Sequence, residues 1–263
     1  HSFPTRRSSD LISGDGRHVG ITGVAAGELL VLRESRSDYT RDNLTETAGM
    51  NGETRLIDDW PGARCNRDFC ALALTRNGRT WQLLIGRGTD YVAELSPKLN
   101  WVKTSGLISP AKWGNLPGGE IFTSPYNSNG RFVVDGVVGD YLCQKYGDIG
   151  ATPLTIDIKD NRIAGLSCAN KELLEEFDKY CHTDENSNRV GEFAIGTNLA
   201  CTRIFGHILQ DEKLPGIHIA FGHPYSEHTG QTWKSTTHID CVGRFFDIWL
   251  DDEQVMAKGK FLI

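Results

Sequence analysis

The sequence predicts an α+β fold, richer in strand than in helix, for the last two thirds of the chain. Short apolar or alternating runs recur between Gly, Pro and Asn residues, which is the pattern of strands joined by turns. Residues 170–181 instead have apolar side chains at helical spacing. With 39% hydrophobic and 24% charged residues, the composition is that of a soluble globular protein. No apolar run approaches the roughly 18 residues that a membrane-spanning helix needs, so no membrane partner is expected.

The expected elements follow from these patterns. Strands are expected at residues 19–21, 28–32, 71–74, 81–85, 91–95, 131–138, 151–158, 163–167, 217–221, 236–241 and 245–250, and a last strand follows a turn at 251–253. Asn77-Gly78 is a hairpin signal between two of them. The helix at 170–181 has an apolar face formed by Leu173, Leu174, Phe177 and Cys181. A second helix is expected at residues 201–210, before Pro215 and Gly216.

Lysine usage divides the chain. Residues 1–97 contain 12 Arg and no Lys, whereas residues 98–263 contain 5 Arg and 11 Lys. Because no fold excludes lysine from a third of its surface, the contrast indicates two coding histories joined in one chain. Local chance or a functional arginine surface is the alternative. We expect the join within residues 85–95.

The first 94 residues are expected to form two parts. Residues 1–11 (HSFPTRRSSDL) resemble a translated sequencing adapter and are left out of the fold prediction as an artefactual leader. Residues 12–94 carry the motifs ISGDGRHVGI, LLVLRESRSDYTRDNLTETAG and DWPGARCNRDFCALALTRNGRTWQLLIGR. These resemble the C-terminal end of the competence (ComEC-type) DNA-uptake proteins, where they close a metallo-β-lactamase-like domain. The resemblance implies a small, mostly-β fragment that lacks the histidine-rich metal motif of that domain.

Charge and cysteine content narrow the class of protein. Residues 1–97 have 12 basic and 13 acidic side chains, and the remainder has 16 and 21, so neither part has the basic excess of a nucleic-acid-binding protein. Five of the seven cysteines follow residue 97 without a close pair, which is typical of reduced thiols and a cytoplasmic location. Cys65 and Cys70 are close enough in sequence for a disulfide, and buried free thiols are equally consistent.

The last two thirds of the chain also contain carboxylates and imidazoles in ordered contexts. His238 and Asp240 are two residues apart in an expected strand and therefore point to one face. His218 lies in an apolar strand, Glu120 follows two glycines, and Glu192 opens a short apolar strand. Three carboxylates and two imidazoles suit a pair of divalent cations, a recurrent device for hydrolysis, better than one.

Each of these residues also has an ordinary structural interpretation. An isolated His-x-Asp is more often an exposed polar strand face, and a lone histidine in an apolar strand is more often a core residue. Glu120 and Glu192, taken singly, fit surface acids as well as ligands. Tyr225 follows the turn of Gly222, His223 and Pro224, which can direct its phenol back over the end of the strand.

Four motifs together are more specific. WGNLPGGEIFTSP, GEFAIGTN, IHIAFGHPY and THIDCV, in this order, resemble the aminopeptidase T-like (thermophilic metalloprotease) family over residues 95–263. The resemblance implies a metallo-aminopeptidase catalytic domain with two divalent ions (zinc, cobalt or manganese) held by Glu120, Glu192, His218, His238 and Asp240. It places the active-site tyrosine at Tyr225. The segment between Tyr225 and His238 is shorter than in many relatives, which leaves the pocket shape open.

The resemblance implies hydrolysis of peptides with a free N-terminus. One ion would hold the α-amine and the other would polarise the scissile carbonyl, while Tyr225 stabilises the oxyanion. Glu120 or Glu192 would take the proton of the attacking water and return it to the leaving amine. The family also implies an N-terminal domain, missing here, and allows a homodimer, so the chain is expected to be truncated. The alternatives are a DNA-uptake module defined by the first part and a non-catalytic relic that binds metal or has lost it.

Overall fold

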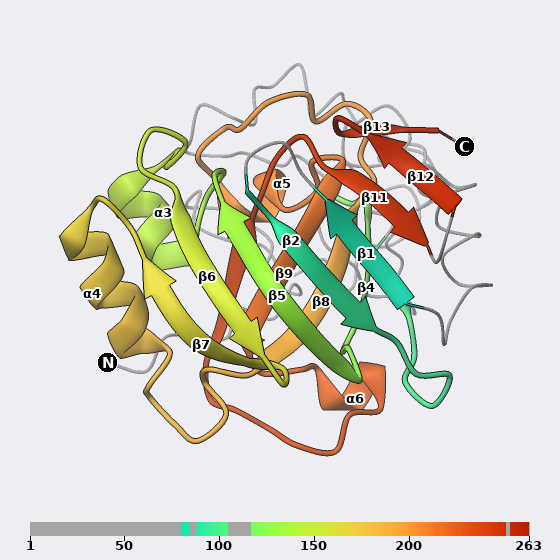
Figure 1. The fold of residues 1–263 in the computed structure, drawn as a ribbon, viewed down its shortest axis with the longest axis horizontal. Coiled ribbons are helices and arrows are strands. Elements are labelled where there is room, and N and C mark those ends of the chain that lie inside the picture. The colour runs from blue at the N-terminus through green and yellow to red at the C-terminus, as the bar shows by residue number, and fades with distance from the viewer. Residues whose placement is uncertain (1–79, 85–87, 105–116, 251–252, 263) are drawn as a thin grey trace, which may run out of the picture.

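The computed structural model describes residues 80–84, 88–104, 117–250 and 253–262, which form two antiparallel β-sheets (Figure 1). In the described residues, one sheet has eight strands in the order β13-β12-β11-β1-β2-β5-β6-β7, and the other has five in the order β10-β9-β8-β4-β3. The eight-stranded sheet consists of β1 (Thr80–Leu84), β2 (Asp90–Glu94), β5 (Asn127–Val134), β6 (Leu154–Lys159), β7 (Arg162–Ser167), β11 (Asp247–Leu250), β12 (Glu253–Ala257) and β13 (Lys260–Phe261). The five-stranded sheet consists of β3 (Val102–Thr104), β4 (Glu120–Thr123), β8 (Val190–Gly196), β9 (Gly216–Gly222) and β10 (His238–Val242). The fold is therefore rich in strand, as expected.

The main core lies where side chains of both sheets meet. Phe132 of β5 stacks on Phe246 with ring centroids 5.8 Å apart, and its edge contacts Tyr91 of β2. From the five-stranded sheet, Phe193 and Phe221 join the same buried cluster. Aromatic pairs of this kind add to the apolar area that the two sheets bury against each other.

Alternation along the five-stranded sheet separates a core face from a polar face. Ile217, Ile219 and Phe221 of β9 belong to the core cluster, so His218 and Ala220 between them point to the other side. All seven residues of β9 are nonetheless buried, because this sheet is covered on both faces there. The polar face is where the candidate ligands lie.

Four helices accompany the sheets in the described residues: α3 (Asp140–Tyr146), α4 (Lys171–Tyr180), α5 (Ile208–Asp211) and α6 (Ser226–Thr229). The helix α4 confirms the expectation for residues 170–181. The side chain of Asn170 caps its first turn by accepting from the Leu173 amide, and Leu173 and Phe177 are buried. Phe177 contacts Phe221 edge-on at 6.1 Å, which fixes α4 against the end of β9.

Two expected elements differ from the structure. The helix expected at 201–210 is wrong, because α5 begins only at Ile208. The carboxylate of buried Asp211 instead accepts hydrogen bonds from the amides of Phe205, Gly206 and His207 and holds them as a loop. The strand expected at 131–138 is shifted: β5 ends at Val134.

The turn after β5 leads to α3, which sequence periodicity did not predict because α3 has only seven residues. The other strands expected after residue 80 are confirmed with shifts of a few residues. Strands expected before residue 80, Asn77-Gly78, Cys65 and Cys70 lie outside the described residues. Of the fragment expected at 12–94, the structure describes β1 and β2, both of which pair with strands of the C-terminal part. The boundary near residue 95 stays a prediction.

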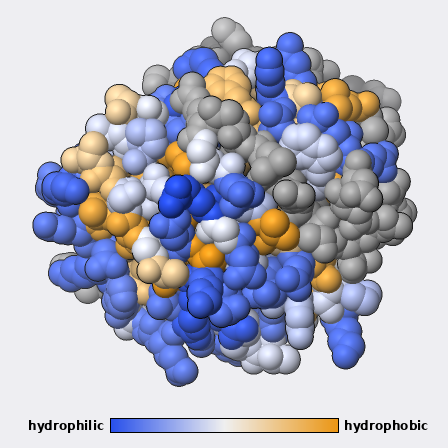
Figure 2. All heavy atoms as spheres, in the orientation of Figure 1, coloured by the Kyte–Doolittle hydropathy of each residue, from blue (hydrophilic) through white to orange (hydrophobic). Residues whose placement is uncertain are grey.

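The surface that faces the viewer in Figure 2 is mostly polar in its described part, with small scattered apolar patches. Within the described ranges, none of the helices has the length and apolar character needed to cross a membrane. The cysteines of the described part, Cys143, Cys168, Cys181, Cys201 and Cys241, are free and buried. The expectation of unpaired thiols after residue 97 is thus confirmed.

Candidate metal centre

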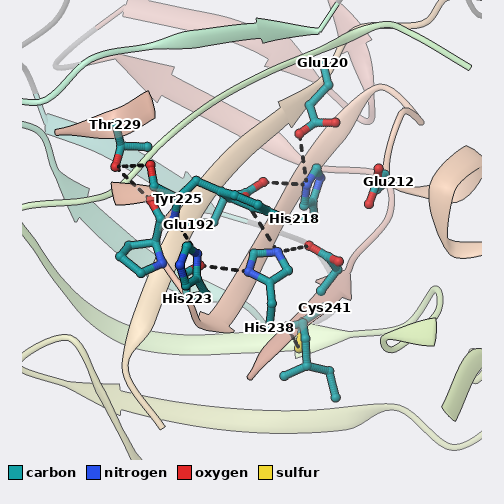
Figure 3. Close-up of polar contacts among 12 residues, drawn as sticks. Glu120, Glu192, Glu212, His218, His223, Tyr225, Thr229, His238 and Cys241 are labelled. Carbon is teal, nitrogen blue, oxygen red and sulfur yellow. Dashed lines mark hydrogen bonds and ion pairs between the residues drawn. The ribbon is translucent and has the colours of Figure 1, made fainter. Parts of the chain in front are cut away.

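The polar face of the five-stranded sheet brings all five expected ligands together (Figure 3). They are Glu120 on β4, Glu192 on β8, His218 on β9, and His238 and Asp240 on β10. These four strands are consecutive neighbours in the sheet. The convergence therefore follows from strand order, because alternate residues of neighbouring strands share one face.

Each expected ligand faces a small residue on one of its neighbouring strands. Glu120 pairs with Gly196, and Glu192 and Asp240 both pair with Ala220. His218 likewise lies opposite Ala194 on β8, and His238 lies opposite Gly222. At Gly196 and Gly222, the backbone carbonyls of Leu214 and Thr237 take the place of a Cβ. Directly opposed side chains point to the same face, so the alanines leave room between the longer side chains. That room is what an ion between them would need.

Glu192 lies between the two imidazoles. Its Oε1 is 3.4 Å from Nε2 of His218, and its Oε2 is 3.6 Å from Nε2 of His238. Asp240 Oδ1 is 3.3 Å from the same His238 nitrogen, and Glu120 Oε1 is 3.9 Å from His218 Nε2. Each carboxylate therefore directs an oxygen toward an imidazole nitrogen.

The donor atoms form three overlapping groups in the described residues, each with its atoms within 4.8 Å of one another. The groups are Glu120, Glu192 and His218; Glu192, His238 and Asp240; and Glu212, His218 and Asp240. Glu192 is common to the first two groups, and His218 is common to the first and third. Such groups of carboxylates and imidazoles could hold divalent metal ions.

The orientation of the imidazoles also fits metal binding. Nδ1 of His238 lies 2.8 Å from the carbonyl oxygen of His223, and since a carbonyl only accepts, Nδ1 carries the proton. A proton on Nδ1 leaves Nε2 of His238 as the nitrogen that could bind an ion once it releases its own proton, as in the usual outer-sphere support of a metal-bound histidine. Nε2 of His218 is buried without a hydrogen bond of good geometry. A cation at this place would satisfy it.

Two functional candidates were missed by the sequence analysis: Glu212 and Lys213, between α5 and β9. Lys213 is fully buried and forms ion pairs with Oε2 of Glu120 and Oε1 of Glu212. It thereby orients Glu120 so that Oε1 faces His218. A run of charged residues before Pro215 is typical of an exposed turn, so nothing in the sequence pattern indicated that these two side chains are buried.

The cluster is strongly charged in the ion-free chain. Burial lowers the pKa of both histidines, but the surrounding carboxylates outweigh it and raise the pKa of His218 to about 9 and that of His238 to about 10. Burial also raises the pKa of Glu212 to about 8, whereas His238 holds the pKa of Asp240 at about 2 against the effect of burial. The positive charges of the two imidazolium groups therefore balance the carboxylates, as bound divalent ions would.

Tyr225 lies at the edge of the cluster, as expected from the turn before it. Its backbone is in the left-handed region, with φ of 47°, which is uncommon for a tyrosine and is stabilised by a hydrogen bond from its amide to Nδ1 of His223. The ring lies 4.8 Å from that of His238 and 5.6 Å from that of Phe122. Burial and the nearby carboxylates raise the pKa of the phenol well above 10, so it remains a hydrogen-bond donor.

Glycine geometry places Glu120. Gly119 has φ of 108°, and a Cβ there would lie 2.6 Å from Cβ of Asn198. The carbonyls of Gly118 and Gly119 accept hydrogen bonds from the Asn198 side chain and the Thr197 amide. This close approach requires glycine and fixes the start of β4, where Glu120 lies.

Comparison with known families agrees with this geometry. The model of the family described as thermophilic metalloprotease (M29) matches residues 71–244, more than half of the 263-residue chain. The chain belongs to the thermophilic metalloprotease (M29) family. The match starts earlier than residue 95, so it includes β1 and β2. A search among curated proteins gave no match.

Two solved structures resemble this metalloprotease in fold. A 2,5-dihydroxypyridine dioxygenase from Pseudomonas putida matches with a TM-score of 0.60 and 21% identity, over 80% of this chain and 60% of the other. AmpT from Thermus thermophilus matches with a TM-score of 0.57 and 22% identity, over 75% of this chain and 53% of the other. The chain therefore spans a little more than half the length of either protein.

The described residues supply candidate groups of His, Asp and Glu side chains that could hold metal ions.

Proposed function

We propose that this chain is a metal-dependent aminopeptidase that binds two divalent ions and hydrolyses N-terminal peptide bonds. The observation that carries the proposal is the position of Glu192, whose two oxygens face His218 and His238 separately, at 3.4 and 3.6 Å. Each imidazole also has a further acidic neighbour. A carboxylate placed between two such imidazoles fits a ligand that two metal ions share.

In this proposal the ligands are Glu120, Glu192, His218, His238 and Asp240. The ions would supply Lewis acidity and an activated water at neutral pH. Tyr225 donates a hydrogen bond to the developing oxyanion from its position over His238. Glu120 or Glu192 takes the proton of the attacking water and returns it to the leaving amine.

The substrate is proposed to be a peptide with a free α-amine, which the buried carboxylates would favour by charge. The name AmpT, an aminopeptidase T-like protein, and the family membership support this substrate class. This chain spans 53% of the length of AmpT. Turnover by the chain alone is therefore part of what must be tested.

The test uses the full chain, stripped with a chelator and reloaded with zinc, cobalt or manganese. We expect two ions per chain by elemental analysis, and hydrolysis of an aminoacyl-p-nitroanilide that is abolished when the substrate amine is acetylated. Chelation should remove the activity and cobalt should restore it. A chain that binds no divalent ion would be the relic, and equal cleavage of the acetylated substrate would refute the aminopeptidase assignment.

A dioxygenase is the second candidate, because one fold neighbour is named as such. Non-haem iron oxygenases use two histidines and one carboxylate, whereas each group of donor atoms in the described residues has one histidine and two carboxylates. Glu120 and Glu192 favour the peptidase, since a single iron would leave these two buried acids without a role. One iron per chain together with oxygen uptake on dihydroxypyridine would decide for the dioxygenase.

A further inference from the structure

We propose that Tyr180, the last residue of α4, is a positioning residue for His238 and thereby controls the affinity of one of the two ion sites. This inference rests on the proposed function, in which His238 is a ligand. Tyr180 has no direct part in the cluster of carboxylates and imidazoles described above. It acts on the backbone of one member of that cluster.

The proposal starts from the place of β10 in the sheet. In the described five-stranded sheet, β10 is an edge strand, paired with β9 on one side. Its outward backbone groups need partners from elsewhere. Asp240 and Val242 find them in the segment 137–139: the Gly139 amide donates to the Asp240 carbonyl, and the Val242 amide donates to the Val137 carbonyl.

At His238 no backbone segment takes this place among the described residues. The hydroxyl of Tyr180 instead accepts a hydrogen bond from the His238 amide, at 3.2 Å, and donates one to the His238 carbonyl, at 3.1 Å. One phenol therefore does what a neighbouring strand would do at this residue, because a hydroxyl both donates and accepts. Burial raises the pKa of Tyr180, so the hydroxyl keeps its proton.

The two ends of His238 are thus fixed by different groups. The imidazole is fixed by its Nδ1 hydrogen bond to the His223 carbonyl, and the backbone is fixed by Tyr180. Nε2 must stay close to Glu192 and Asp240, at 3.6 and 3.3 Å, for the three to share an ion. Ligand geometry tolerates displacements of only about 0.5 Å. Loss of the backbone anchor is therefore expected to weaken this ion more than the other.

The segment after Tyr180 reinforces the same strand. The carboxylate of Asp184 accepts hydrogen bonds from the amide and hydroxyl of Thr236 and from the hydroxyl of Ser235. Ser235 and Thr236 lie three and two residues before His238. Residues 180–184 consequently hold the beginning of β10 at two points, and α4 is itself fixed against β9 through Phe177 and Phe221.

The experiment compares Tyr180→Phe with the matched control Tyr146→Phe. Tyr146 also donates a hydroxyl hydrogen bond, to Glu176 of α4 at 3.2 Å, but it is on α3 and does not contact the cluster. The metal-free full chain is titrated with cobalt(II) by calorimetry and by visible absorption, which reports the ligands of each bound ion. We expect two binding events in the native chain and in Tyr146→Phe.

In Tyr180→Phe we expect one site to be weakened by about 10- to 100-fold, the usual effect of removing an outer-sphere contact, while the other stays unchanged. Asp184→Asn, which loosens the same strand from its other anchor, should weaken the same site to a smaller extent. It provides a second measurement if Tyr180→Phe folds poorly.

Unchanged affinities in Tyr180→Phe, or equal weakening of both sites, would overturn the inference while leaving the proposed function intact. Absence of cobalt binding by the native chain would overturn both. Two bound ions without peptide hydrolysis would refute the aminopeptidase and still allow the selective effect of Tyr180 to be measured.

Discussion

Lys213 offers a direct test of how the charged cluster is balanced. It is fully buried, and both of its partners, Glu120 and Glu212, are less than a tenth exposed. Lys213→Met keeps an unbranched side chain of similar length and removes the charge. Two buried carboxylates then lose their common cation, and breaking a buried ion pair from one side costs about 3–5 kcal/mol.

For a chain of this size, 1 kcal/mol corresponds to about 2–4 °C in melting temperature, so Lys213→Met should melt about 6–20 °C below the native chain in chelator. Melting is followed by circular dichroism. The deficit should be larger at pH 9 than at pH 6, because the raised pKa of Glu212, about 8, lets that carboxyl become neutral at the lower pH. Cobalt should shift the variant upward by more than the native chain, since the ion replaces the missing positive charge.

The matched control is Lys145→Met. Lys145 also bridges two glutamates, Glu172 and Glu176, but it lies at the surface with a third of its side chain exposed. Exposed pairs contribute little, so this variant should melt close to the native chain and respond to cobalt in the same way. Equal melting of Lys213→Met and the native chain in chelator would refute the reasoning that Lys213 balances buried charge.

Three other predictions concern the cluster itself. Tyr225→Phe should keep its metal content and lose about 100- to 1000-fold in kcat, the usual effect of removing one oxyanion donor; unchanged turnover would remove Tyr225 from catalysis. Ala220→Leu should fill the space between the ligands and abolish cobalt binding, whereas Ala93→Leu in the core should lower stability by about 1–3 kcal/mol and leave binding intact. Cobalt affinity should rise with pH from 7 to about 9, because His218 and His238 have raised pKa values near 9 and 10 and must release protons to bind. In the metal-free chain, the stabilisation of the fold by the two charged imidazoles is complete below pH 6.5 and is lost as pH rises through their pKa values. A fall in cobalt affinity between pH 7 and 9 would contradict the assignment of His218 and His238 as ligands.

The sequence predicted the strands that carry Glu192, His218, His238 and Asp240 because their patterns are local, but it predicted no strand at Glu120, where β4 begins. His238 and Asp240 could be assigned to one face from spacing alone, and Ile239 between them is buried as alternation requires. That four strands are neighbours in the order β10-β9-β8-β4 is not a local property. It depends on long-range pairing, so the convergence of the ligands rested on the resemblance.

The parts that sequence reasoning missed depend on tertiary contacts. Glu212 and Lys213 look like surface residues. The ion pairs of Lys213 with Glu212 and Glu120 offset the cost of burying these charges. Residues 201–207 have an apolar pattern compatible with a helix, but the three hydrogen bonds to Asp211 favour a loop. Tyr180 was read as part of an amphipathic helix, and its contact with His238 spans 58 residues of sequence.

The two faces of the five-stranded sheet link folding to chemistry. Because side chains alternate with a period of two, shifting β9 by a single position would bring Ile217 and Ile219 to the ligands and turn His218 into the apolar core. Such a shift would bury an unpaired imidazole on one face and place isoleucines among the polar side chains on the other. Both changes would destabilise the misaligned sheet. The same hydrophobic force that aligns the strands therefore also selects the one alignment in which the donor atoms meet.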